Sequence, residues 1–224
     1  MSDDNIRVCM DVVLPEQGQE LAVTKQWANG KRLRVHFLGG DPQVQKKVTH
    51  YAKQWEAYAN ITLDFVNDPT AEIRVGFVMN NTSWSAIGTD ALNQQFFAPG
   101  AATMNYGWLK PNSDEQEFSR VILHEFGHSL GCIHEHQNPA GNIPWNKEAV
   151  YRYYAKQGWD KARVDQNLFR KYALDQTQFT AFDKKSIMLY PIPKELTDGL
   201  MEVGWNRKLS DTDKRFIGEK YPKP

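Results

Sequence analysis

Polar and apolar residues alternate most clearly in the first third of the chain. Residues 31–38 alternate along their whole length, which predicts a strand with one buried face. From Asp41, an expected N-cap, to about Ala59, apolar residues recur at helical spacing. Two further apolar runs, residues 61–66 and 71–78, are typical of strands separated by a turn. The pattern therefore predicts a β-α-β-β order.

The other segments carry weaker patterns. Residues 6–14 indicate a short strand, residues 80–100 a loop, and residues 101–109 a further strand. Residues 148–172 are expected to be helical in parts. A last helix is expected to begin after Ser210, which opens a capping pattern.

A long helix is predicted in the middle of the chain, with Ser113 and Gln116 forming a capping box at its start. Its apolar stripe, which would face the core, consists of Phe118, Val121, Ile122, Phe126 and Leu130. His124 and His128 project from a different face. The helix therefore has an apolar back and a front that carries two imidazoles.

One segment, beginning at His124, reads H-E-x-x-H-x-x-G-x-x-H-E. His124 and His128 are four residues apart, so they share one helix face and can reach one metal ion. Gly131 can take positive φ and end the helix, after which the chain can return and offer His134 as a third nitrogen. Three protein ligands leave one tetrahedral position open, which is the catalytic type of zinc site. Glu125 stands where a general base for a water molecule would be.

The full motif is typical of the metzincin clan of zinc peptidases, and Glu135, directly after the third histidine, narrows the resemblance to the astacin family. A second stretch agrees with the first, because residues 186–190 read S-I-M-L-Y and match the S-x-M-x-Y Met-turn of that family. Met188 or Tyr190 alone would be unremarkable, but the order and separation of the two motifs favour a functional interpretation of both. The chain resembles astacins most strongly over residues 124–139 and at this Met-turn.

The resemblance implies an α+β fold of the metzincin two-lobe type, with a twisted mixed sheet and helices above the cleft and an irregular, mostly helical lobe below it. It implies a zinc-dependent endopeptidase that uses one catalytic zinc ion, a water molecule and Glu125 as general base. In the family, the residue matching Met188 forms an apolar floor under the metal, and the residue matching Tyr190 reaches the metal or the reacting carbonyl. Glu135 would anchor the site from behind the ligands, often tied to the mature N-terminus, and residues 101–109 would line the cleft as an edge strand.

The same resemblance suggests three parts of the chain. Residues 1–29 would be an N-terminal extension or pro-segment, with an ordinary first strand as the other interpretation. Residues 30–131 would form the upper lobe with the sheet and the zinc helix. Residues 132–224 would form the lower lobe with the third histidine, the Met-turn and the C-terminal helix.

Cys9 is a candidate latency ligand in a zymogen. A thiolate is a strong zinc ligand, and a cysteine held over the metal would displace the catalytic water, as in the cysteine switch of matrixins. Astacins more often use an aspartate from an F-x-G-D motif, and the residues around Cys9 match neither flanking signature. A buried free thiol and a disulfide with Cys132 are the other interpretations.

Length and charge restrict the class of protein. The 224 residues suit one domain or two lobes that share a cleft. Lys and Arg together number 27, as do Asp and Glu, so the formal net charge is zero and a nucleic-acid partner is not expected. No apolar run reaches the length of a membrane span, and we expect a monomer that acts on a protein or peptide substrate. Residues 1–5 show no secretory signal, and two cysteines are few for a secreted animal astacin, but secretion or delivery outside the cell is still favoured.

Other interpretations stay open at this point. An effector or toxin protease with one narrow target would fit the missing signal, whereas a non-catalytic zinc-binding module would not need Glu125. Lys194, just beyond the Met-turn, could favour acidic substrate residues or be an ordinary surface lysine. His36 and His50 have no partner at motif spacing, and His136 is interpreted as structural.

Overall fold

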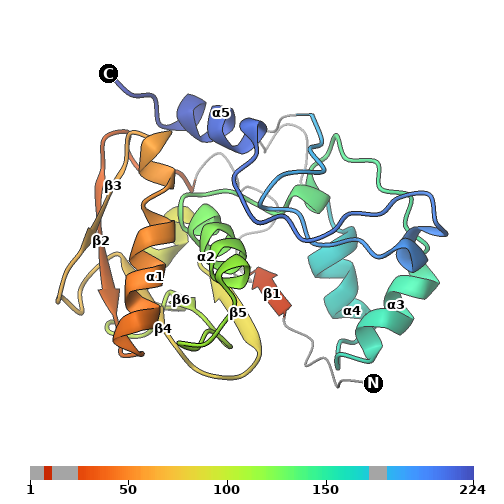
Figure 1. Ribbon diagram of the computed structural model, residues 1–224, viewed down its shortest axis with the longest axis horizontal. Helices are drawn as coiled ribbons and strands as arrows, with labels where there is room; N and C mark the ends of the chain where they lie inside the picture. The colour runs from red at the N-terminus through yellow and green to blue at the C-terminus, as the bar shows by residue number, and fades with distance from the viewer. Residues whose placement is uncertain (1–7, 12–24, 172–180) are drawn as a thin grey trace.

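The computed structural model describes residues 8–11, 25–171 and 181–224, and it confirms the α+β fold (Figure 1). The strands of its single sheet are β1 (Val8–Asp11), β2 (Arg32–Phe37), β3 (Thr62–Phe65), β4 (Ile73–Gly76), β5 (Thr82–Ser85) and β6 (Met104–Asn105). The α-helices are α1 (Pro42–Ala52), α2 (Glu115–Ser129), α3 (Lys147–Ala155), α4 (Lys161–Val164) and α5 (Asp211–Lys220). Shorter helical turns are η1 (Trp55–Ala57), η2 (Gly88–Leu92), η3 (Glu135–Gln137), the π-turn η4 (Asp165–Phe169) and η5 (Lys194–Thr197). None of the helices in these ranges has the length and apolar character that a bilayer crossing needs.

The sheet is mixed, and its strands lie in the order β1-β5-β6-β4-β2-β3. Neighbouring strands are parallel except for β5 and β6, which are antiparallel. The succession β2, α1, β3, β4 confirms the predicted β-α-β-β order. The predicted N-terminal strand is also present as β1, although parts of residues 6–14 lie outside the described residues.

The prediction for the cleft edge of the sheet was wrong. The strand expected over residues 101–109 is only the two-residue β6, and it lies inside the sheet between β4 and β5. The strand next to β1 is β5, within residues 80–100 that were expected to be a loop. Its sequence is T-S-W-S, so its inward positions are serines rather than apolar residues. Ser83 and Ser85 can be buried because their hydroxyls form hydrogen bonds with the main chain. A search for regularly spaced apolar residues cannot detect such a strand.

Two helix boundaries also differ from the prediction. The helix α1 begins after the expected cap Asp41, but it ends at Ala52 and is followed by the separate turn η1. The N-cap of α2 is Asp114, whose carboxylate accepts from the main-chain N–H of Gln116 at 2.7 Å. The hydroxyl of Ser113 instead accepts from the N–H of Lys110 at 2.9 Å, so the capping box predicted at Ser113 does not form. The capping box at Ser210 is present at the start of α5.

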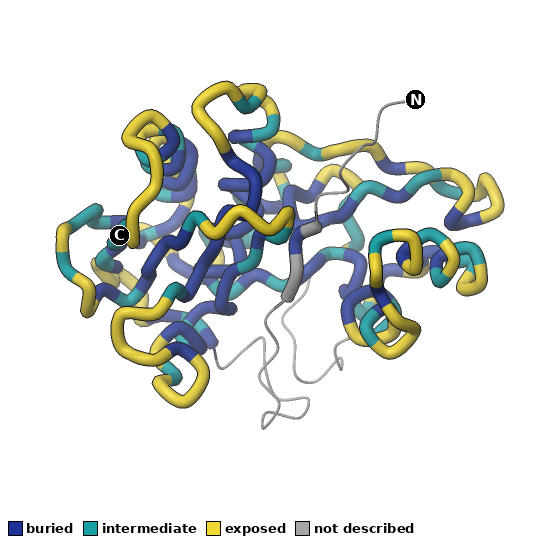
Figure 2. Tube along the Cα trace, turned by 90° about the horizontal axis from the view of Figure 1, so that it is seen from below, coloured by how far each residue is buried: buried dark blue, intermediate teal, exposed yellow. Residues whose placement is uncertain are grey.

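The core lies around α2, which runs through the middle of the molecule (Figure 1), and the buried segments gather in the interior while the exposed ones lie at the periphery (Figure 2). The predicted apolar stripe of this helix is buried, and it consists of Phe118, Val121, Ile122, Phe126 and Leu130. Leu123, which the prediction did not include, is buried as well. The indole N–H of Trp55 donates to the carbonyl of Leu123 at 3.1 Å and ties η1 to this helix. The helix is therefore a rigid base for the polar residues on its other face.

Two segments that are distant in the sequence, at Trp27 and Tyr221, meet at the C-terminal end of α2. The hydroxyl of Tyr221 donates to the carbonyl of Leu130 at 2.8 Å and accepts from the N–H of Trp27 at 3.2 Å. The indole of Trp27 donates to the carbonyl of Ser129 at 2.8 Å. Nearby, Lys25 forms a buried ion pair with Asp90. These contacts use carbonyls that the last turn of a helix leaves without intrahelical partners.

Candidate active site

Three histidines converge at the end of α2. The Nε2 atom of His124 lies 3.1 Å from that of His134 and 3.2 Å from that of His128, and the remaining pair is also 3.2 Å apart. All three side chains are buried. In a tetrahedral zinc site with Zn–N bonds of about 2.0–2.1 Å, neighbouring nitrogens lie about 3.3 Å apart. The three nitrogens therefore fit one zinc ion.

Hydrogen bonds on the far side of the rings fix this orientation. The Nδ1–H of His124 donates to the carbonyl of Ile187, and that of His128 donates to the carbonyl of Cys132, each at 2.8 Å. A proton on Nδ1 leaves the lone pair on Nε2, which is the tautomer that a metal requires. Burial and the two neighbouring imidazoles hold the pKa of His124 well below its usual value, so this ring is neutral.

The chain reaches the third ligand by the predicted turn. Gly131 follows the end of α2 and has a φ of +96°. Glycine adopts this conformation readily, whereas a residue with a side chain would be strained in it. The N–H of Glu135 then donates to the carbonyl of Met188 at 3.0 Å, which joins this segment to the Met-turn. The two sequence motifs are thus held together by main-chain contacts.

Glu125 and Cys9 lie directly beside the histidines. Glu125 is completely buried, and ligand atoms of Cys9, His124 and Glu125 all lie within 4.8 Å of one another. The Cys9 sulfur interacts with the Glu125 carboxylate, and its burial and that negative charge raise the pKa of the thiol well above its usual value. Both cysteines are free, so the disulfide between Cys9 and Cys132 that we considered is not formed.

Tyr190 closes the site from the Met-turn. Its hydroxyl donates to the main-chain carbonyl of Cys9, and its ring centre lies 4.3 Å from that of His134. The ring also packs 4.7 Å from that of His136, whose Nε2 donates to the carbonyl of Asn167 at 2.7 Å. His136 therefore contacts the residues around the metal site without belonging to the group of converging nitrogens.

Met188 packs against the back of the metal helix. It is 3% exposed, and a Cβ atom built on Gly127 would lie only 2.4 Å from its sulfur. The helix and the Met-turn can approach this closely only because residue 127 has no side chain. The sequence motif does not include Gly127 among its fixed positions. A glycine between Glu125 and His128, inside a helix, could nevertheless have indicated a close packing contact there.

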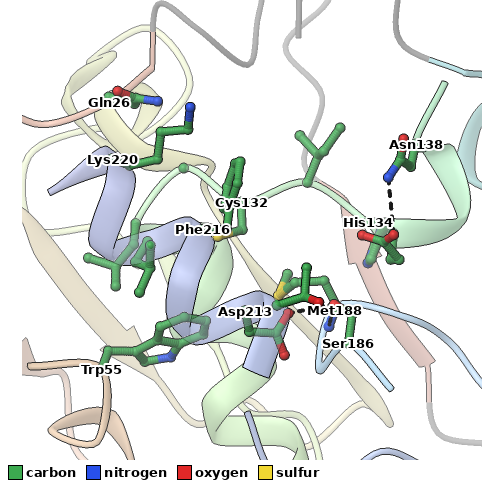
Figure 3. Close-up of a pocket in the computed structure, with 16 residues that line it drawn as sticks. Gln26, Trp55, Cys132, His134, Asn138, Ser186, Met188, Asp213, Phe216 and Lys220 are labelled. Carbon is green, nitrogen blue, oxygen red and sulfur yellow. Dashed lines mark hydrogen bonds between the residues drawn. The ribbon is translucent and has the colours of Figure 1, made fainter. Parts of the chain in front are cut away.

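Behind the third histidine lies a cavity bounded by the end of α2, the Met-turn and α5 (Figure 3). Glu135 lines it and accepts from the amide of Asn138 at 3.1 Å and from the N–H of Asp183 at 2.8 Å. Burial raises the pKa of Glu135 to about 7. Asp213 accepts from the Ser186 hydroxyl at 2.7 Å in the same wall. Glu135 is therefore held by Asn138 and by Asp183, a residue of the segment that leads into the Met-turn.

Sequence reasoning missed Arg120, which lies one helical turn before His124 on the same face. It is buried, forms an ion pair with Glu117 at 2.6 Å and interacts with the Cys9 sulfur. Its guanidinium carbon lies 3.9 Å from the centre of the Trp205 ring. The spacing of four residues from Arg120 to His124 to His128 could have shown that Arg120 shares their helix face.

Lys194, in contrast, is largely exposed and pairs with Glu202, as expected of an ordinary surface lysine.

Comparisons with known proteins agree with this geometry. Two solved structures of myroilysin are similar to the chain: one is 46% identical, covers 91% of this chain and 98% of its own, and has a TM-score of 0.87. The other is 45% identical, covers 98% and 93%, and has a TM-score of 0.73. High choriolytic enzyme 1, a hatching enzyme zinc-protease from the medaka fish Oryzias latipes, shares the fold at 16% identity, with coverage of 89% and 94% and a TM-score of 0.59. No family model and no curated protein sequence matches the chain.

Proposed function

Because this chain belongs to the astacin family of metzincin zinc peptidases, we propose that His124, His128 and His134 hold its catalytic zinc and that Glu125 is its general base. The protein is a zinc-dependent endopeptidase that acts on proteins or peptides. The observation that carries the residue assignment is the convergence of three Nε2 atoms within 3.2 Å of one another, with Glu125 beside them on α2.

Bound zinc would supply a Lewis acid that lowers the pKa of water toward about 7. The buried Glu125 carboxylate would take the proton of the attacking water and deliver it to the departing amine. Its rigid place on α2, next to His124, keeps the carboxylate close to the metal ligands. The buried position also excludes bulk water, which strengthens each electrostatic contact in the site.

Tyr190 is proposed to stabilise the reacting carbonyl. Its hydroxyl already donates to the carbonyl of an extended strand beside the histidines, namely β1. A substrate backbone in the same place would present a carbonyl to the same donor, and the bond would strengthen as negative charge develops on that oxygen. Met188 is proposed to form the apolar floor, and Glu135 to anchor the third-histidine segment from behind.

Cys9 is proposed to hold the intact chain in a latent form. The strand β1 pairs with β5, and it places the Cys9 sulfur beside His124 and Glu125, where water and substrate must enter. A thiolate at this point would occupy the open zinc position at about 2.3 Å. Since Lys25 and Trp27 pack firmly against the domain, the removable part is proposed to end before Lys25.

Zinc analysis combined with peptide-library cleavage tests this function. Wild type should contain one zinc per chain, and once the segment before Lys25 has been removed it should cleave internal peptide bonds, lose activity with a chelator, and regain it when zinc is restored. Glu125→Gln should keep its zinc and its fold but lose about a hundredfold or more of its turnover, because a carboxamide cannot accept a proton. Near-normal turnover of Glu125→Gln would show that another residue is the base. A monomeric state and action outside the cell stay predictions.

A further inference from the structure

The hydroxyl of Tyr106 is a buried polar group that the mechanism above does not use. Tyr106 directly follows β6, and its side chain is completely buried. Its phenol oxygen has no hydrogen-bond partner among the residues that the structure describes. A buried hydroxyl without a partner is unfavourable, and nearly all such groups in proteins find one. The hydroxyl of Tyr106 is therefore a donor that is not committed to another described residue.

The sheet register places the Tyr106 side chain on the face of the sheet that carries Cys9. Cys9 pairs with Ser83, and Trp84 pairs with Asn105 in the antiparallel β5–β6 ladder, so one step further Ser83 lies opposite Tyr106. Residues directly opposite one another on neighbouring strands point to the same face of a sheet. Cys9 points to α2, because its sulfur reaches Glu125. The row of Cys9, Ser83 and Tyr106 therefore faces α2.

The charge of Glu125 reaches Tyr106. Burial raises the pKa of the Tyr106 phenol well above its usual value, and the negative charge of Glu125 raises it further, followed by that of Cys9. The phenol is consequently a permanent hydrogen-bond donor. In the intact chain the Cys9 thiol hydrogen-bonds to the carboxylate, whereas the Tyr106 hydroxyl has no hydrogen-bond partner among the described residues.

We propose that Tyr106 is a positioning residue for Glu125: once β1 has left the cleft, its hydroxyl donates to the Glu125 carboxylate and holds one oxygen so that the other faces the water. This inference rests on the proposed roles of Glu125 and Cys9. Tyr106 does not touch substrate or metal, so its effect would pass only through the carboxylate. Removing the hydroxyl should then lower kcat and leave KM and zinc content unchanged.

The test uses the zinc-loaded full chain, assayed before and after limited proteolysis, with kcat and KM taken from the form that cleaves peptide. Tyr106→Phe should lower kcat by roughly tenfold, as loss of a supporting hydrogen bond around a metal site does, with KM within about twofold of wild type. The matched control is Tyr154→Phe, which removes a buried phenol oxygen from α3 and should leave kcat unchanged. The melting temperature of intact Tyr106→Phe should equal or exceed that of wild type, because no hydrogen bond is lost there.

Combination with Glu125→Gln separates the possible outcomes. If Tyr106 acts through the carboxylate, Tyr106→Phe should cause no further loss in the Glu125→Gln background. A kcat of Tyr106→Phe within about twofold of wild type, or an equal loss in both backgrounds, would overturn the positioning role alone. Turnover that survives in Glu125→Gln would overturn the proposed base itself, and the role of Tyr106 with it.

Discussion

The hydroxyl of Tyr190 donates to the main-chain carbonyl of Cys9, so a single four-residue strand engages both the tyrosine of the Met-turn and the carboxylate of Glu125. The thiol reaches the carboxylate while the carbonyl of the same residue reaches the phenol. Two groups proposed for catalysis are thus occupied by one residue of the N-terminal segment.

Tyr190→Phe should keep its zinc and its fold but hydrolyse peptides more slowly. Loss of one neutral hydrogen bond is worth about 1.4 kcal/mol, or roughly tenfold in rate. The ring still packs against His134, so the ligands should stay in place. Peptide hydrolysis and metal content measured across a range of pH values check this, with Tyr58→Phe, a partly exposed tyrosine, as the control. Unchanged rates at every pH would remove Tyr190 from the mechanism.

His128→Ala should lose zinc and activity together. Its Nε2 supplies one of the three converging nitrogens, and two imidazoles alone bind zinc much more weakly than three. Metal analysis after dialysis, run beside peptide hydrolysis, measures both effects. His50→Ala, which changes an exposed histidine on α1, should keep both zinc and activity. Full zinc retention with activity in His128→Ala would refute the ligand assignment.

Cys9→Ser should raise the activity of the intact chain, because a hydroxyl is a far weaker zinc ligand than a thiolate. One peptide substrate is used to compare wild type, Cys9→Ser and a chain trimmed before Lys25. Cys132→Ser is the matched control, because Cys132 is the other buried free thiol. The switch is discarded if wild type, Cys9→Ser and the trimmed chain share one rate.

Gly127→Ala should destabilise the fold by about 1–3 kcal/mol, the usual effect of overpacking. The added methyl would meet the Met188 sulfur at 2.4 Å and the Trp55 ring at 3.2 Å. Urea unfolding of the single variants and of Gly127→Ala/Met188→Ala gives a double-mutant cycle. Because removing the Met188 side chain makes room for the methyl, the two losses should sum to more than the loss in the double variant. If the changes in unfolding free energy of the two single variants simply add up in the double variant, the helix does not pack against the methionine.

The parts of the fold that sequence predicted are those with a strong period or a rigid spacing. The alternation of residues 31–38 predicted β2, and the spacing of His124 and His128 predicted two imidazoles that converge. The register of β5 was not predictable, because Ser83 and Ser85 are buried through hydrogen bonds rather than apolar contact. The local sequence also could not decide whether Ser113 or Asp114 is the N-cap of α2, because both side chains can accept a hydrogen bond from a main-chain N–H.

Contacts between distant segments account for the rest of the site. Nothing near Cys9 in the sequence shows that its thiol would meet Glu125, because β1 reaches α2 only by pairing with β5. In the same way, Arg120 packs against Trp205, which is distant from it in the sequence. The division into lobes at residue 131 stays a prediction.

The bridge made by Tyr221 bears on how this peptidase is synthesised. A ribosome produces the metal helix long before it adds Tyr221, yet that residue, near the very end of the sequence, holds the carbonyl of Leu130 and the N–H of Trp27. Until Tyr221 has been synthesised and has folded against α2, the end of the helix lacks this support. Because residues 130 and 221 are 91 positions apart, the metal helix cannot gain this contact from its own neighbourhood in the sequence, and its C-terminal end is completed late in folding.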